Sequence, residues 1–484
     1  MRKALLLLPL GRDLGAFTIF IRNGQERKKQ MTNLFPEVLG IETGQNSELA
    51  NRIVDRIKAG NPLVDIKPYK VGASSILNIP TAVPKKSKDK IIWEAAKKAV
   101  IIREKQERPE AGGLRFLHVF VSVGDVVEEY QFTLSIENEC PYMCQFCYIQ
   151  GSLAEKPIPT IFTNVQDKGL LLREVKIALL AMHMHTQTHG FKHNIGWDRQ
   201  KWVHRLIGVL NKATPTEVVD VPIQQIFDDN KETIKKALTD SKWELLKPIL
   251  EKFDTLNFQN TTAQFKFNCG EINDALVYDH LTDNSKFLIE LFSSDAMKND
   301  GAVLLFRTKS ANFDNLKKMS PGENIRVSVT ILPAIFVKGP PDHIDRLKGA
   351  DELLKLGYQI SMNIDPIILT TDTVKTYKKI IDDIKTHFDY GSDRFHRITI
   401  GMLRFGTGNL DNNIRKRHSD LHGHAKRNMT KVKGDEKFRY GRVKRIDIYK
   451  ELIGYIQSEM PGIEVELSTE PVDVWKDVGL SWEG

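Results

Sequence analysis

The chain has 484 residues, of which 41% are hydrophobic and 27% charged, and it contains only four cysteines. Such a composition is ordinary for a globular protein with a large core, and four cysteines in a chain of this length exclude a disulfide-stabilised framework. The net charge of +8 is concentrated toward the C-terminal end.

The first ten residues, Met1 to Leu10, begin like a signal peptide, with basic residues before an apolar run. Pro9 interrupts the run, Arg12 and Asp13 end it, and no small-residue cleavage site follows. We therefore expect a buried strand here, no membrane-spanning segment anywhere, and a cytoplasmic protein.

The next elements follow an alternating pattern. Residues 1–125 mix short apolar runs with basic connections and are expected to form an N-terminal α/β extension. Strands are predicted from alternating or β-branched runs at 128–136, 263–269, 303–309, 326–332, 359–368 and 397–405. Helices are predicted between them at 343–357 and 373–388, and a helical insertion at about 185–262.

Strands that alternate with helices predict parallel strands joined by right-handed crossovers. The fold class is therefore α/β, a partial (β/α)6 barrel over 126–410, followed by a basic C-terminal segment at 411–484. Functional side chains in such a barrel lie at the C-terminal ends of the strands. Cys140 and Cys269 both follow a predicted strand.

The stretch ENECPYMCQFCYIQG, residues 137–151, holds Cys140, Cys144 and Cys147. Three closely spaced thiols can bind three corners of a [4Fe–4S] cluster and leave the fourth iron open to a small chelating molecule. A zinc site is the alternative, although zinc would require a fourth ligand at short spacing.

The CxxxCxxC spacing, with the aromatic Phe146 before the last cysteine, resembles the signature of the radical S-adenosylmethionine (SAM) superfamily. Further stretches resemble the spore photoproduct lyase family, in order along most of the chain apart from the insertion. They are SSILNIP (74–80), KAVIIRE (98–104), CQFCYIQGSLAEKP (144–157), FKFNCGEINDALVYDHLTD (265–283), LLFRTKSANFDNL (304–316), RVSVTI (326–331) and FRYGR (438–442).

The resemblance implies a [4Fe–4S] cluster and SAM as cofactors, and DNA or a thymine-containing nucleotide as partner. It also implies an external electron donor of the flavodoxin or ferredoxin type. In that family the adenosyl radical takes hydrogen from C6 of a thymine dimer, the bridge between the bases breaks, and a thiol returns a hydrogen atom.

By the same resemblance, Cys269 would be the hydrogen donor and Tyr148 would assist it. Phe146, Gly270, Lys309 and Ser328 would contact SAM, with the Lys309 ammonium suited to the SAM carboxylate. An ordinary buried cysteine is the alternative for Cys269. The family's DHLT matches Asp279 and His280, for which helix capping is the alternative.

Three features depart from the family. Phe146 stands where the family has a tyrosine, so this residue has no O–H for the return of hydrogen to SAM. LRFGTG (403–408) replaces the family's HRFT, and the insertion is large. A second interpretation is therefore a radical SAM enzyme that modifies or isomerises another thymine-derived base or nucleotide. A third is a zinc-stabilised nucleic-acid-binding protein without catalysis.

Residues 415–445 contain twelve Lys or Arg against three acidic residues, a net charge of +9. This segment is either a solvated loop or a surface that faces phosphates, with aromatic residues available for stacking. The predicted nucleic-acid contacts are Arg415, Lys416, Arg417, Lys437, Arg439, Tyr440 and Arg442. A weaker signal is a histidine-rich stretch that would bind a metal or form a polar surface, with His183, His185, His189 and His193.

Overall fold

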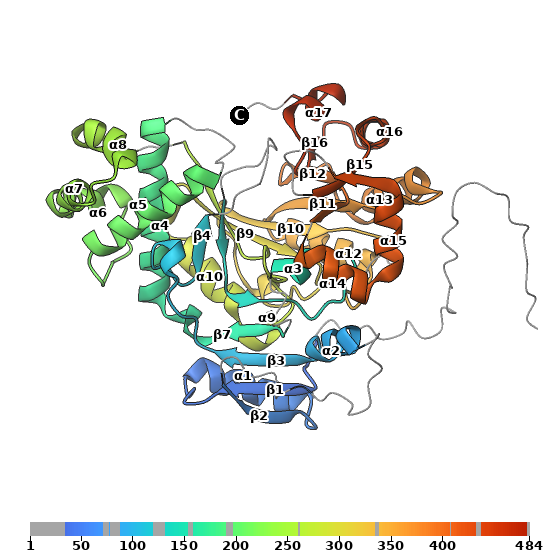
Figure 1. Cartoon of the computed structure of the whole chain (residues 1–484), viewed down its shortest axis with the longest axis horizontal. Coiled ribbons are helices and arrows are strands. Elements are labelled where there is room, and N and C mark those ends of the chain that lie inside the picture. The colour runs from blue at the N-terminus through green and yellow to red at the C-terminus, as the bar shows by residue number, and fades with distance from the viewer. Residues whose placement is uncertain are drawn as a thin grey trace, which may run out of the picture.

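The computed structural model describes residues 34–70, 77, 88–119, 131–152, 158–189, 197–259, 262–333, 338–406, 408–431 and 437–481. The strand expected near the N-terminus and His193 lie outside these residues. Within them, no helix combines the length and the apolar character needed to cross a membrane. The residues that the structure describes form three sheets with helices around them (Figure 1).

The first sheet has five strands in the order β2-β1-β3-β7-β6 and lies below the rest of the molecule in Figure 1. β6 is antiparallel to β7 and the other pairs are parallel. Two of its strands, β6 and β7, lie after residue 125, so this sheet includes residues outside the predicted N-terminal extension of 1–125. The bounds are β1 Val38–Glu42, β2 Asp65–Tyr69, β3 Ala99–Arg103, β6 Glu137–Asn138 and β7 Thr160–Phe162.

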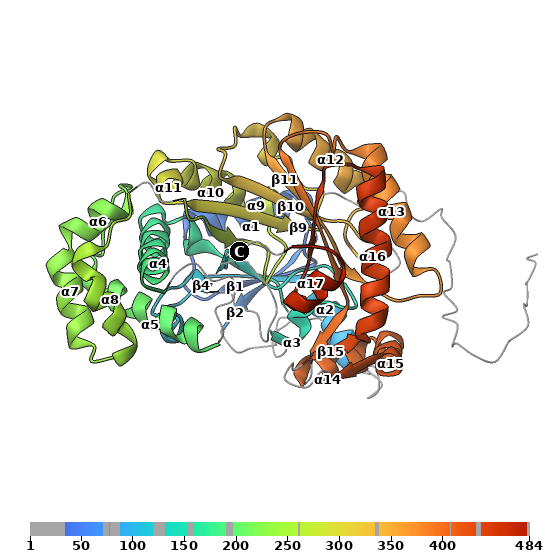
Figure 2. The same cartoon turned by 90° about the horizontal axis from the view of Figure 1, so that it is seen from above.

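The second sheet has eight strands in the order β16-β12-β11-β10-β9-β8-β5-β4 and forms an open barrel (Figure 2). All neighbours are parallel except β4, which is antiparallel to β5. The predicted partial barrel is confirmed with its six parallel strands, β5 and β8 to β12, and β16 adds a seventh parallel strand from the C-terminal segment. The bounds are β4 Leu117–Val119, β5 Gln131–Leu134, β8 Phe265–Asn268, β9 Ala302–Thr308, β10 Ile325–Thr330, β11 Gln359–Ile367, β12 Phe395–Met402 and β16 Glu464–Leu467.

The outer face of this sheet is apolar because strand side chains alternate between two faces. On β11, Ile360, Met362 and Ile364 are at most 1% exposed and belong to the larger hydrophobic core. Helices cover this face, among them α4 Lys168–His189, α10 Asn284–Phe292, α12 His343–Lys355, α13 Thr373–His387 and α16 Arg442–Glu459. The predicted helices at 343–357 and 373–388 are therefore confirmed.

The beginning and end of α12 follow from local chemistry. The Asp342 side chain accepts a hydrogen bond from the Ile344 N–H at 3.0 Å and caps the first turn. Gly357, with φ of 97°, ends the helix in the left-handed region that favours glycine.

The predicted insertion is helical and projects to the left in Figures 1 and 2. Its helices are α5 Trp197–Ala213, α6 Ile223–Asp229, α7 Lys231–Asp240 and α8 Lys247–Lys252, and the preceding α4 already begins at Lys168. The buried Lys176 of α4 joins the insertion to the barrel, because its ammonium pairs with Asp300 at 2.8 Å while Asp300 also accepts from the Ile223 N–H at 3.0 Å.

The C-terminal segment forms a small third sheet of order β13-β15-β14 and also supplies β16 to the barrel sheet. The remaining bounds are β13 Arg404–Gly406, β14 Met429–Lys431, β15 Lys437–Tyr440, α1 Glu48–Gly60, α2 Lys88–Ala96, α3 Ile149–Ser152, α9 Asp279–Thr282, α11 Asp295–Asn299, α14 Asn409–Arg417, α15 Ser419–Asn428 and α17 Val472–Asp477. Short 3-10 helices occupy Pro109–Ala111, Thr163–Gln166, Glu244–Leu246, Phe253–Thr255 and Leu316–Lys318.

Candidate active site

The inner face of the barrel sheet is polar and half-exposed. On β11, Ser361, Asn363 and Asp365 are partly exposed and alternate with the buried apolar residues of the outer face. Strand register continues this polar face across the sheet, because Ser328 of β10 lies opposite both Ser361 and Arg307 of β9. The open barrel therefore presents a polar surface to a ligand, as substrate-binding faces of such sheets do.

The three-cysteine loop lies between β6 and α3, at the carboxyl-terminal edge of the barrel strands. Cys140 and Cys144 are buried, at 9% and 5% exposure, and Cys147 is half-buried. The loop is held by hydrogen bonds from the Met143 N–H to the Lys338 carbonyl at 2.8 Å and from the Gln150 side chain to the Cys144 carbonyl at 3.1 Å. All four cysteines are free thiols.

Cations lie close to these thiols. Burial raises the pKa of Cys144 to about 12, and the positive charge of Lys309 opposes that rise. Burial also raises the pKa of Cys147, which Lys309 and Lys97 oppose. Lys97 is itself buried and forms an ion pair with Glu139 at 2.5 Å. The two lysines therefore favour the thiolate forms that iron requires.

The arrangement of the three cysteines fits a [4Fe–4S] cluster better than a single metal ion. Within the described ranges, no three His, Cys, Asp or Glu side chains converge closely enough to hold a single metal ion. In a [4Fe–4S] cluster each thiolate binds a different iron, so this convergence is not needed. Phe146 packs between the larger core and the smaller core that contains Cys140 and Cys144.

A hydrogen-bonded group that sequence reasoning did not predict lies beside this loop. The Glu271 carboxylate accepts from the Tyr148 hydroxyl at 2.8 Å, from the Asn268 amide at 3.0 Å and from the Arg307 guanidinium at 3.2 Å. Glu271 is 7% exposed and Tyr148 48% exposed. In the sequence, the signal that could have indicated this group is the Gly270-Glu271 pair, which follows β8 and Cys269. Glu271 thereby fixes the position of Tyr148.

The three other residues predicted to contact SAM lie on neighbouring strand ends. A Cβ atom on Gly270 would lie 2.1 Å from the Arg307 carbonyl oxygen, so close packing against β9 requires glycine here. The Lys309 N–H donates to the Asp274 carboxylate at 2.5 Å. Ser328 is buried on the inner face and its hydroxyl accepts from the Asn363 amide.

Cys269 follows β8 but lies apart from the other three thiols. Its side chain is fully buried in the larger hydrophobic core, and its N–H donates to the Leu305 carbonyl at 2.9 Å. Cys269 comes two residues after Phe267, so by strand alternation the two side chains point to the same face of the sheet. The ring centroids of Phe267 and Phe292 of α10 are 5.3 Å apart on that face. Burial, and next to it the carboxyl of Glu137, raise the pKa of the Cys269 thiol well above its ordinary value.

The remaining weaker candidates have structural partners. The Asp279 carboxylate accepts from the Ser285 N–H at 2.8 Å and caps α10, and the His280 ring bonds to the Leu34 carbonyl at 3.1 Å. In α4, His185 and His189 stack at 5.0 Å, and both rings pack edge-on against Trp202. His183, of the same helix, is hydrogen-bonded to the Asp300 carbonyl at 2.9 Å.

Three of the predicted nucleic-acid contacts have buried side chains in this structure. Arg417, Arg439 and Tyr440 are 5%, 3% and 1% exposed. Arg439 donates to the Thr469 carbonyl at 3.0 Å. The Tyr440 hydroxyl accepts from the Leu369 N–H at 3.3 Å. These groups stabilise the C-terminal segment internally.

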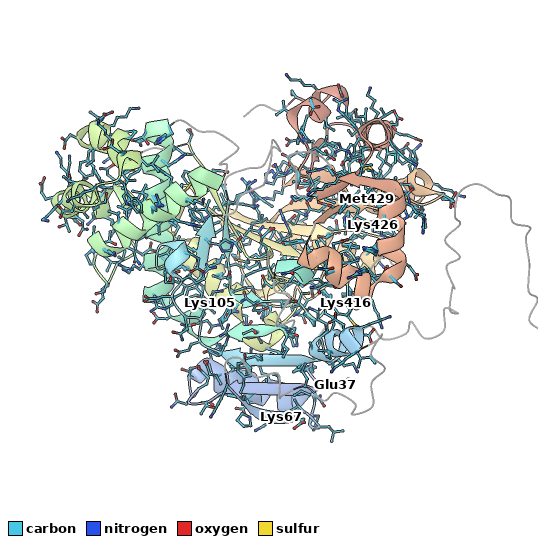
Figure 3. The ribbon with its side chains drawn as sticks, viewed as in Figure 1. Glu37, Lys67, Lys105, Lys416, Lys426 and Met429 are labelled. Atoms are coloured by element: carbon cyan, nitrogen blue, oxygen red, sulfur yellow. The ribbon has the colours of Figure 1, made fainter. Side chains whose placement is uncertain are left out.

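The other predicted contacts differ in accessibility. Arg415 and Lys416 are exposed on α14, and Lys416 pairs with Asp89 of α2 at 3.3 Å (Figure 3). Arg442 is exposed but pairs with Asp473 at 3.0 Å and with Asp477. Lys437 is half-buried on β15. Lys426, which was not predicted as a contact, is exposed over the Phe438 ring at 4.1 Å (Figure 3).

Solved structures with the same arrangement of strands and helices are forms of one enzyme. A mutant of spore photoproduct lyase with dinucleoside spore photoproduct has a TM-score of 0.57 and 15% identity, covering 90% of this chain and 100% of that chain. Another mutant, with bound AdoMet and dinucleoside spore photoproduct, has a TM-score of 0.55 and 14% identity, covering 90% and 99%. The chain has the fold of spore photoproduct lyase.

The complex of spore photoproduct lyase with dinucleoside spore photoproduct also matches, with a TM-score of 0.55, 15% identity and coverage of 90% of this chain and 99% of that chain. No protein-family model and no curated protein sequence matches the chain. At 14–16% sequence identity, the similarity to these structures shows a shared fold and nothing more specific. The similarity in fold covers 90% of this chain.

Proposed function

We propose that this chain is a radical SAM enzyme that repairs a thymine dimer of the spore photoproduct type in DNA. The observation that carries the proposal is the three-cysteine loop with its CxxxCxxC spacing, which follows the first parallel strand of the barrel sheet. Its occurrence in the spore photoproduct lyase fold adds the substrate class.

In this proposal Cys140, Cys144 and Cys147 hold a [4Fe–4S] cluster, and Lys309, Ser328, Gly270 and Phe146 contact SAM. Together these groups would supply a carbon-centred radical able to remove hydrogen from an unactivated C–H bond. The polar inner face binds and orients the substrate. The buried loop excludes water from the reacting atoms, and the electron enters from an external flavodoxin-type or ferredoxin-type donor.

Hydrogen return would fall to Cys269, which directly follows β8 and stands in the stretch FKFNCGEIND that resembles the donor motif of the family. Its thiol is fully buried, which protects a sulfur radical from solvent. Tyr148, fixed by Glu271, would assist from the half-exposed side of the site. Phe146 has no O–H group, so a relay to SAM cannot pass through that residue.

The exposed cations Arg415 and Lys416 would contact DNA phosphates at the edge of this site. Such contacts make affinity fall as salt rises. Lys437 and Arg442 could join them only after release from their present surroundings, since Arg442 is already paired with Asp473.

The test is anaerobic reconstitution with iron and sulfide, followed by reduction with SAM and a dinucleotide that contains the dimer. We expect about four irons per chain, 5′-deoxyadenosine, and conversion of the dimer to thymines. Cys144→Ala should lose the iron and the activity together. Cys269→Ala should keep both the iron and SAM cleavage but divert the product to adducts.

Two results would contradict the proposal. A reconstituted protein that stays colourless and makes no 5′-deoxyadenosine is not a radical SAM enzyme. SAM cleavage without dimer repair would favour the second candidate, an enzyme that modifies or isomerises another thymine-derived base or nucleotide. The absence of a phenol at Phe146 and the presence of Glu271 beside Tyr148 are the observations that keep that candidate open.

A further inference from the structure

The carboxylate of Asp365 is held in a fixed orientation on the inner face of the barrel, near the carboxyl-terminal end of β11. Its Oδ2 atom accepts from the Ser468 hydroxyl at 2.6 Å and from the Arg404 Nη2 at 3.3 Å. The Arg404 Nη1 also donates to the Ser468 carbonyl at 2.8 Å. A Cβ atom on Gly401 of β12 would lie 2.8 Å from the Asp365 Cγ and 2.7 Å from the Ser468 Cβ, so this packing requires glycine.

The second oxygen of the same carboxylate is open to a ligand. Oδ1 of Asp365 has no hydrogen-bond partner among the residues that the structure describes, and this atom is not sealed from solvent. The side chain is 23% exposed. Asn363, two residues earlier on the same face, donates its amide N–H to Ser328, and its Oδ1 likewise has no partner among the described residues. β11 therefore presents two acceptor atoms, which suit N–H donors of a ligand.

The place of Asp365 in the sheet favours the substrate over SAM as that ligand. The residues expected to contact SAM follow β8 and β9 or lie on β10, as Gly270, Lys309 and Ser328 do. Strand order places β11 beyond β10 from the three-cysteine loop, and the partners of Asp365 follow β12 and β16, which are farther still. Asp365 also lies roughly 7 Å along the strand from Asn363. A molecule bound beside SAM on this side is therefore the one that reaches Asp365.

We propose that Asp365 accepts a hydrogen bond from the N3–H group of a thymine ring and thereby selects bases that carry a proton at this position. The proposal rests on the function proposed above, which supplies thymine as the substrate class. A carboxylate forms a stronger hydrogen bond with N–H than a neutral acceptor does. Cytosine has an unprotonated nitrogen at the same place, so two acceptors would face each other and both would lose their hydration.

The test uses the full chain without iron or SAM, so that its outcome is separate from the repair assay. Calorimetric titrations compare thymidine, 3-methylthymidine and deoxycytidine. The wild type should bind thymidine about tenfold or more tightly than the other two, the loss expected when a charge-assisted hydrogen bond is missing. Equal affinities for thymidine and 3-methylthymidine, or no binding of thymidine, would overturn the proposal, whatever the result of the assay for 5′-deoxyadenosine and repair.

Asp365→Asn should reverse the preference between the bases. Arg404 and Ser468 donate hydrogen bonds, so they hold the carbonyl oxygen of the new amide and leave its NH2 group toward the ligand. The variant should bind thymidine about tenfold more weakly than the wild type, and deoxycytidine more tightly than thymidine. The control Glu323→Gln changes an exposed carboxylate before β10, at the opposite edge of the sheet, and should leave both affinities unchanged. Wild-type affinity for thymidine in Asp365→Asn would contradict the proposal.

Two further measurements separate base recognition from other roles of Asp365. SAM affinity of the reconstituted chain should be equal in the wild type and in Asp365→Asn. A loss of SAM affinity with unchanged thymidine affinity would assign the carboxylate to SAM and overturn the proposal. Ser468→Ala removes one donor to Oδ2 but keeps the acceptor, so it should weaken thymidine binding less than Asp365→Asn does. If urea denaturation shows that Asp365→Asn is unfolded, the comparison of thymidine with 3-methylthymidine in the wild type still decides.

Discussion

Replacing Gly270 with alanine tests the geometry at the carboxyl end of β8. The added Cβ would lie 2.1 Å from the Arg307 carbonyl oxygen and 2.7 Å from the Arg307 Cβ. That carbonyl cannot easily retreat, since it accepts from the Ala275 N–H at 3.2 Å. The strand end must therefore shift, and the ion pair between Glu271 and Arg307 shifts with it.

The size of the effect follows from these contacts. Overpacking costs about 1–3 kcal/mol, and a weakened hydrogen bond to Glu271 adds about 1 kcal/mol. We therefore expect Gly270→Ala to lower the free energy of unfolding by about 2–4 kcal/mol. Urea denaturation measures the global change. Amide hydrogen exchange of a peptide spanning 265–275 should show the loss locally.

Gly454 provides a matched control with the opposite sign. It lies inside α16, is exposed, and has nothing within 4 Å of an added Cβ. Alanine there should raise the free energy of unfolding by about 0.5–1 kcal/mol, because glycine is unfavourable within a helix. If both variants change stability equally, or if Gly270→Ala leaves exchange at 265–275 unchanged, the close approach of β8 to Arg307 is refuted.

Two further predictions concern single side chains. A double-mutant cycle with Tyr148→Phe and Glu271→Gln should give a coupling energy of about 1 kcal/mol in urea denaturation, and additive effects would contradict a direct bond. His183 tests pH dependence, because burial lowers its pKa from 6.5 to about 4. Because the pKa of His183 is higher in the unfolded state, the unfolded chain takes up the proton at a higher pH than the folded chain does. The free energy of unfolding therefore decreases as the pH falls from 6.5 toward 4. The wild type should lose up to about 1.4 kcal/mol per pH unit relative to His183→Gln in that range, and a constant difference would contradict the assignment.

The barrel was predictable from sequence because its strands and helices have regular periods. β9 and β10 lie within one or two residues of the predicted 303–309 and 326–332, and α12 and α13 also match. Periodicity works here because one face of each element is buried against the same core. The three-cysteine loop was equally evident, since ligand spacing within one loop is a local property.

The first sheet could not be predicted in the same way. β6 has two residues and β7 three, too few to show a period, and both join strands that lie far before them in the chain. The Glu271 group depends on similar long-range contacts, because Tyr148 precedes Glu271 by 123 residues. Only the fold brings such pairs together, so local patterns contain little information about them.

The basic C-terminal segment shows why charge counting alone misplaces function. Its excess of lysine and arginine predicted either a solvated loop or a phosphate-facing surface. Instead, Arg439 and Arg445 are buried with Glu470 between them, and the Tyr449 hydroxyl donates to the same carboxylate at 2.9 Å. Glu470 lies 25 residues beyond Arg445, outside the segment whose charge was counted. A buried carboxylate that neutralises two guanidinium groups converts apparent surface charge into internal support. The number of charges in a segment therefore does not show which of its side chains face a ligand.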